Sequence, residues 1–155
     1  MTSVIVIRVR ATVGVRGDIQ DTMKLIGLNR ANHAVVIPLN DSYKGMLQKI
    51  KDYCTWGEAD EAVLADLINA RGKAVGDVDI DDAYVAEHSS YKTVAELAKA
   101  IAEGEGKVKD VEGMKPVFRL HPPVKGYEGN KHAYAEGGAL GYRGAAIADL
   151  VRRMI

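Results

Sequence analysis

The stretch Val4-Ile-Val-Ile-Arg-Val-Arg10 opens the regular structure of the chain and decides what kind of fold can follow. It is rich in β-branched residues, which favour strands. Successive side chains of a strand point to opposite faces, and the two faces here are Ile5, Ile7 and Val9 against Val4, Val6, Arg8 and Arg10. Because the second face begins apolar and ends basic, we expect the end of this strand to emerge toward a partner.

Helix and strand signals alternate after this strand. Asp18 is expected to cap a helix that ends at Gly27. A buried strand is expected over residues 34–37, a second helix after Asn40, and a short strand over residues 54–56. Asp60 should cap a third helix. The order β-α-β-α-β-α predicts an α/β fold in which helices cover a small sheet.

The second half of the chain gives weaker signals. Thr93-Val-Ala-Glu96 has the pattern of a capping box and predicts a helix. Residues 116–120 predict a strand, and residues 147–154 predict an amphipathic helix. Between them, residues 121–144 are so rich in Gly and Pro that we expect no regular element there. The expected organisation is a core domain over 1–58, an acidic helical lobe over 59–114 and a basic arm with a C-terminal helix over 115–155, packed together.

Charge is segregated along the chain although 21 basic and 21 acidic residues balance overall. Residues 1–55 hold eight basic and four acidic residues, residues 56–114 hold six and fourteen, and residues 115–155 hold seven and three. A basic surface is typical of proteins that bind polyanions, although a solvated face is the plainer explanation. The acidic middle is expected to face solvent or protein.

The residues that could carry catalysis or hold a metal are scattered. His33, His88, His121 and His132 lack metal-ligand spacing, and the single Cys54 is expected to be a core residue. Asp79, Asp81 and Asp82 are expected to form a solvated loop rather than a magnesium site. These residues therefore show no pattern that indicates catalysis or a metal site. No apolar run approaches the roughly 18 residues of a membrane span, and we expect a cytoplasmic protein that does not bind membranes.

The basic arm offers the clearest binding chemistry. It interleaves cations with Tyr127, Tyr134 and Tyr142; cations neutralise phosphates, and aromatic rings stack on bases. The arm is thus either an RNA-binding segment or a loop packed on its own protein. Two other functions stay open. The glycine-rich turn 137–144 precedes a helix and could hold a small anion or nucleotide, and the acidic lobe could serve as a protein-interaction module.

The chain resembles a known family over nearly its whole length. In the first half the resemblance lies in Ile5-Val-Ile-Arg-Val-Arg10, Val13-Gly-Val-Arg16, Leu25-Ile-Gly-Leu-Asn-Arg30, His33-Ala-Val-Val36, Tyr43-Lys-Gly-Met-Leu-Gln-Lys49 and Thr55-Trp-Gly-Glu58. In the second half it lies in Phe118-Arg-Leu-His-Pro-Pro-Val-Lys-Gly126, His132-Ala-Tyr-Ala-Glu-Gly-Gly138 and Arg152-Arg-Met154. These motifs are similar to those of the large-subunit ribosomal protein thirty family, in its archaeal form with a C-terminal extension.

This resemblance implies a β-α-β-α-β core with an antiparallel sheet, similar to half of a ferredoxin-like fold. It implies a structural protein of the large ribosomal subunit, in contact with large-subunit rRNA near the 5S rRNA and with neighbouring ribosomal proteins. It also implies no catalysis, no cofactor and no small-molecule substrate. The RNA-binding residues that it implies are Arg8, Arg10, Arg16, Arg30, His33, Lys44, Lys49, Arg119, His121, Lys125, Lys131, His132 and Arg143.

Overall fold

A mixed sheet of five strands forms the centre of the computed structural model, which describes residues 3–11, 13–129 and 131–155. The strands are β1 (Ser3–Arg8), β2 (His33–Pro38), β3 (Cys54–Glu58), β4 (Val117–Arg119) and β5 (Gly141–Tyr142), arranged in the order β4-β2-β1-β3-β5. The first four strands pair antiparallel, and β5 runs parallel to β3. This confirms the α/β class and the β-α-β-α-β start.

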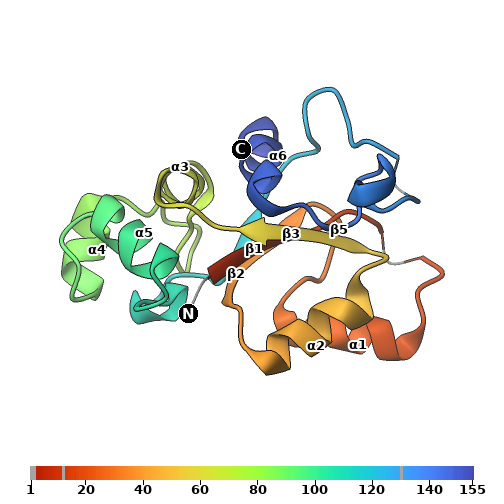
Figure 1. Ribbon diagram of the computed structural model, residues 1–155. Coiled ribbons are helices and arrows are strands. Elements are labelled where there is room, and N and C mark those ends of the chain that lie inside the picture. The colour runs from red at the N-terminus through yellow and green to blue at the C-terminus, as the bar shows by residue number, and fades with distance from the viewer. Residues whose placement is uncertain (1–2, 12, 130) are drawn as a thin grey trace.

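Helices cover both faces of the sheet (Figure 1). The first face packs against α1 (Gly17–Ile26) and α2 (Asp41–Ile50) through Val4, Val6, Val35, Leu47 and Trp56. The second face packs against α3 (Glu61–Arg71) and α6 (Ile147–Met154) through Ile5, Ile7 and Phe118. Because both faces of β1 are covered, all six of its residues are buried, which explains its nearly continuous apolar run.

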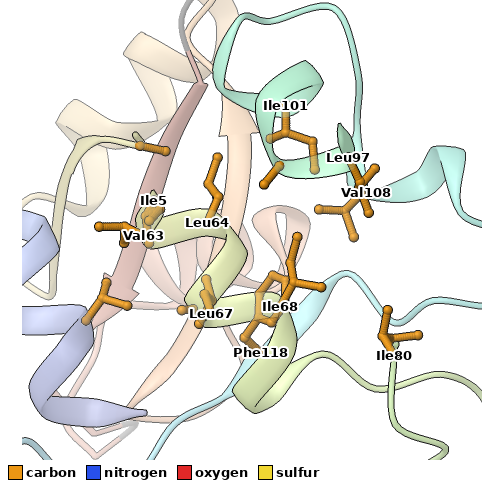
Figure 2. Packing of buried hydrophobic residues seen from close by; sticks show 14 of the residues in the cluster. Ile5, Val63, Leu64, Leu67, Ile68, Ile80, Leu97, Ile101, Val108 and Phe118 are labelled. Atoms are coloured by element: carbon orange, nitrogen blue, oxygen red, sulfur yellow. The ribbon is translucent and has the colours of Figure 1, made fainter. Parts of the chain in front are cut away.

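The acidic lobe continues the second core away from the sheet. It holds α3, α4 (Asp82–His88) and α5 (Val94–Ala102), and Figure 2 shows Leu64 and Ile68 of α3 packed near Leu97 and Ile101 of α5. In Figure 1 this lobe lies on the left, and β5 with the loop that precedes it lies on the right. The β5 end of the arm is thus remote from the lobe, whereas its C-terminal helix α6 packs against α3, where Arg152 lies 3.6 Å from Asp66.

The helix starts show which capping predictions were right. Asp60 accepts a hydrogen bond from the Val63 amide at 2.9 Å, as expected. The prediction for Asp18 was wrong, because α1 already begins at Gly17, with Asp18 in its first turn, and Arg16 occupies the N-cap without a side-chain bond. Helix α4 was not predicted; Asp81 caps it by accepting from the Tyr84 amide at 2.8 Å.

The prediction that residues 121–144 hold no regular element was also wrong. They include β5 and a short 3₁₀ helix, Tyr134–Glu136. The reason is a close approach that glycine permits: a Cβ at Gly57 of β3 would overlap the carbonyl oxygen of Gly144. Glycine there lets the chain between β5 and α6 lie directly on the sheet, which sequence periodicity does not reveal.

Candidate nucleic-acid interface

Three basic side chains stand in a row across the end of the sheet. In the antiparallel pairing of β2 with β4, His33 lies opposite Arg119. One step beyond the Ile7–Ala34 pair, Arg8 of β1 lies opposite His33. Directly opposed residues share a face of the sheet, so Arg8, His33 and Arg119 are neighbours on the face that carries α1 and α2. We call these three residues the basic row.

The arginines of the basic row form no ion pair with a carboxylate in the part of the chain that the structure describes. The nearby Arg30 likewise takes part in none of the ion pairs found among the described residues. Like charges placed opposite each other destabilise a sheet. Repulsion between like charges also acts on His33. Burial, together with the positive charges of Arg119, Arg30 and Arg8, holds the pKa of His33 below its ordinary value of 6.5. At neutral pH the row is therefore an uncharged imidazole between two guanidinium groups.

Arg8 lies beneath this surface rather than on it. Only 1% of the residue is exposed. Its guanidinium donates to the carbonyl oxygens of Leu28 and Arg10, both at 2.9 Å, while its Nη2 is buried without a partner among the described residues. Burial lowers its pKa. Arg8 is thus the buried member of the basic row, whereas Arg119 and the nearby Arg30 are exposed.

The remaining basic residues of the core surround the same end of the sheet or the helices beside it. Arg10 is half-buried and stacks over the Tyr53 ring at 5.1 Å. Arg16 and Lys49 both approach Asp18, at 3.1 and 3.9 Å, so the structure brings the start of α1 and the end of α2 together. Lys44 is exposed near the start of α2, apart from the basic row.

Arg143 fastens the arm instead of pointing outward. Its side chain is 2% exposed, and it donates to Thr55 Oγ1 and to the Ala139 carbonyl oxygen, both at 2.8 Å. It also lies over the Tyr134 ring at 5.0 Å and 3.8 Å from a Glu128 carboxylate oxygen. The cation that the glycine-rich turn 137–144 would offer a small anion is therefore engaged inside the fold.

The other basic and aromatic residues of the arm form two groups: those that bond to other parts of the chain and those that are exposed. A ring nitrogen of His121 lies 2.9 Å from the Ile155 carbonyl oxygen, which ties the arm to the C-terminus. Tyr127 donates to the side chain of Asn32 at 2.6 Å, which places the arm beside the loop that leads into the basic row. Lys125, Lys131 and His132 are exposed. The burial of Arg8 and Arg143 does not favour direct phosphate contacts by these two side chains.

The structure adds three basic residues that sequence analysis did not single out. Arg71, Lys73 and Lys115 line a cavity together with Arg119. Arg71 and Lys73 were missed because residues 56–114 carry a net negative charge, which gave no indication of a basic site there. The only available signal was the position of Lys115, immediately before the predicted strand at 116–120.

Other chemistry finds little support among the described residues. Cys54 is fully buried, and burial raises the pKa of its thiol to about 12, opposed by the charge of Arg8, so the thiol stays protonated at neutral pH. Within the described ranges, no three His, Cys, Asp or Glu side chains gather as a metal site would require. None of the helices described has the length and apolar character to cross a bilayer.

Fold and site together define an α/β protein that presents an unbalanced basic end of a sheet and an acidic lobe. Residues 4–54 match the family model described as ribosomal protein L30p/L7e. The chain is 54% identical to the large ribosomal subunit protein uL30 of Methanobrevibacter smithii, over 97% of this chain and 99% of that protein. It is 52% identical to uL30 of Methanopyrus kandleri, over 94% and 99% of the two chains.

A third relative, uL30 of Methanococcus maripaludis, is 51% identical over 97% of both chains. The chain belongs to the uL30 family of large-subunit ribosomal proteins, in its archaeal form. This confirms the family expected from the sequence and makes the protein a non-enzymatic, structural member of that family.

Proposed function

We propose that this protein binds large-subunit rRNA through the basic end of its sheet, near the 5S rRNA and in contact with neighbouring ribosomal proteins. The observation that carries the proposal is the basic row with Arg30. Burial and the nearby positive charges of Arg119, Arg30 and Arg8 hold the pKa of His33 below its ordinary value, and none of these three arginines forms an ion pair with a carboxylate among the described residues. A phosphate backbone supplies the missing negative charge.

The exposed members would make the contacts and the buried ones would support them. Arg30 and Arg119 are exposed at the row, with Arg10, Arg16 and Lys49 beyond it, and Lys125, Lys131 and His132 extend the surface along the arm. Arg8 and Arg143 hold the loops beneath. Contacts of this kind fix the position of a protein on RNA without reading base sequence, which suits a structural subunit protein.

The proposal is tested by the salt dependence of binding to large subunits stripped of this protein. Replacing Arg30 or Arg119 by Gln removes one phosphate contact each, so each log–log salt slope should shrink by about 0.7 to 0.9. Both side chains are exposed, so folding should be little affected. Lys99→Gln, an exposed change on α5 in the acidic lobe, is the charge-matched control and should keep the wild-type slope. Equal slopes for all four proteins would refute the proposal.

A further inference from the structure

A cavity lies at the outer edge of β4. Apart from Arg119, the residues that line it have no part in the proposed function. It has a volume of about 250 Å³ and is lined by Arg71, Lys73, Asp77, Lys115, Val117 and Arg119. Sheet pairing leaves this edge of β4 open, since β4 is the terminal strand of the sheet. The cavity is smaller than the roughly 300–1,000 Å³ of typical ligand pockets, so its size suits a small group rather than a whole cofactor.

The charges of the cavity are partly balanced. Lys115 Nζ donates to Asp77 Oδ1 at 2.9 Å, and Lys73 forms an ion pair with Asp79. The positive charges of Lys115, Arg119 and Lys73 hold the pKa of the Asp77 carboxyl below its usual range, the bond from Lys115 being the main cause. Asp77 therefore stays charged and occupied with its lysine.

The two arginines of the cavity remain without such partners. Neither Arg71 nor Arg119 takes part in an ion pair among the described residues. Arg71 stands in the last turn of α3, and Arg119 ends β4, so two rigid elements present them to one space. After the two lysines are matched with two aspartates, a surplus of two positive charges is left. Planar guanidinium groups are suited to binding phosphate oxygens in pairs.

We infer that this cavity is a phosphate-binding site in which Arg71 and Arg119 are the main donors. The inference rests on the proposed function, because Arg119 also ends the basic row and joins the two places into one surface. The phosphate comes either from the rRNA backbone or from free phosphate. An rRNA backbone that passes from the row into the cavity would contact the acidic lobe beside Arg71 and Lys73.

The experiment uses two probes with the intact protein. Inorganic phosphate is titrated against ¹⁵N-labelled protein at neutral pH, and the arginine Nε–H resonances are followed by NMR. Binding to stripped large subunits is measured over a range of salt concentrations. Arg71→Gln is compared with Lys99→Gln, since both remove a cation from the last turn of a helix and so lose the same favourable interaction with the helix dipole.

If the cavity binds phosphate, the Arg71 and Arg119 resonances move and saturate in the wild type and in Lys99→Gln, and Arg71→Gln abolishes saturation. A salt slope reduced by about 0.7 to 0.9 in Arg71→Gln identifies the phosphate as part of rRNA. An unchanged slope with saturable phosphate binding identifies free phosphate as the ligand. The inference would be overturned if phosphate binding does not saturate in the wild type and Arg71→Gln keeps the wild-type salt slope.

Asp77→Asn gives a second, opposite readout. Asp77 has a φ of 58°, a left-handed conformation that Asn also tolerates, so the backbone should be preserved. Removing this negative charge frees Lys115 and should tighten phosphate binding several-fold. Weaker phosphate binding in Asp77→Asn would contradict the site. Arg30→Gln separates the two proposals: a smaller slope for Arg30→Gln, beside no saturable phosphate binding in the wild type and a wild-type slope for Arg71→Gln, leaves rRNA binding intact and refutes only the cavity.

Discussion

The acidic lobe and the basic end of the sheet use their charges in different ways. In the lobe, carboxylates are engaged within the fold: Asp60 and Asp81 cap helices, and Asp82 accepts from the Val94 amide at 2.8 Å. At the end of the sheet, Arg30 and Arg119 have no such partner among the described residues. Charges that the fold already uses stabilise it, and charges that it leaves unbalanced mark where a partner of opposite sign belongs.

Arginine shows the same difference within the basic regions. Arg143 is buried with good hydrogen bonds and belongs to the fold, whereas Arg119 is exposed and belongs to the surface. We therefore predict the largest effect on stability at Arg143. Arg143→Met removes donors to Thr55 and to the Ala139 carbonyl, at a cost of about 2–4 kcal/mol. Urea denaturation measures the loss.

The same change should release the arm. Limited proteolysis of Arg143→Met should cut between Gly126 and Gly141 faster than in the wild type. Arg152→Gln, which removes an exposed guanidinium 3.6 Å from Asp66, is the control and should change stability by less than about 1 kcal/mol. Equal stability and equal protease resistance of wild type and Arg143→Met would show that Arg143 does not hold the arm.

A several-fold effect on RNA binding is expected at Arg16. Its side chain is 77% exposed and its one ion pair, with Asp18, is exposed as well. Arg16→Gln should leave the free energy of unfolding unchanged and lower the salt slope for stripped large subunits by about 0.7 to 0.9. Arg16 and Arg119 lie on separate segments, so their effects should roughly add. If Arg16→Gln keeps the full slope, the RNA surface does not extend from the sheet to α1.

A smaller effect is expected at His33 and depends on pH. Its folded pKa is lowered, so acidification protonates the unfolded chain first and stability falls as the pH drops below the ordinary value of 6.5, down to the folded pKa. His33→Gln should lose less stability than the wild type over this window, measured by thermal unfolding between pH 7 and 5. Identical pH dependence of the two proteins would remove His33 from the electrostatic description of the row.

The smallest effect is expected in the lobe. Asp79, Asp81 and Asp82 changed together to Asn should leave affinity for stripped subunits unchanged or slightly raised, because the change removes only negative charge and, at Asp79, releases Lys73 of the cavity. Asn can accept the same capping bonds at positions 81 and 82, so the variant should fold. A large loss of affinity in the folded variant would mean that the lobe contacts a basic partner or a metal.

Much of the fold was predictable from local signals. The apolar run at 4–7, the cap at Asp60 and Gly27, whose φ is 105°, place β1, α3 and the end of α1. Helix α4 was missed because its seven residues contribute only Val85 as a buried position. Strand β5 was missed because it depends on Gly57 accepting the chain near Gly144, a contact between residues far apart in sequence.

The candidate site was predictable only in part. Strand alternation placed Arg8 on a face that ends basic, but it could not show that Leu28 and the loop after α1 cover that side chain. The pairing of His33 with Arg119 depends on sheet register across 86 residues. Arg71 was missed because the charge of a segment does not show which of its residues meet in space.

We propose that rRNA phosphates supply the negative charge that the fold does not provide at the end of the sheet. A density map of the large subunit with this protein bound is the decisive test. We expect rRNA phosphates within hydrogen-bonding distance of Arg30 and Arg119, with α4 and α5 turned away from RNA. A map in which the end of the sheet faces solvent, while rRNA packs against α4 and α5, would contradict it.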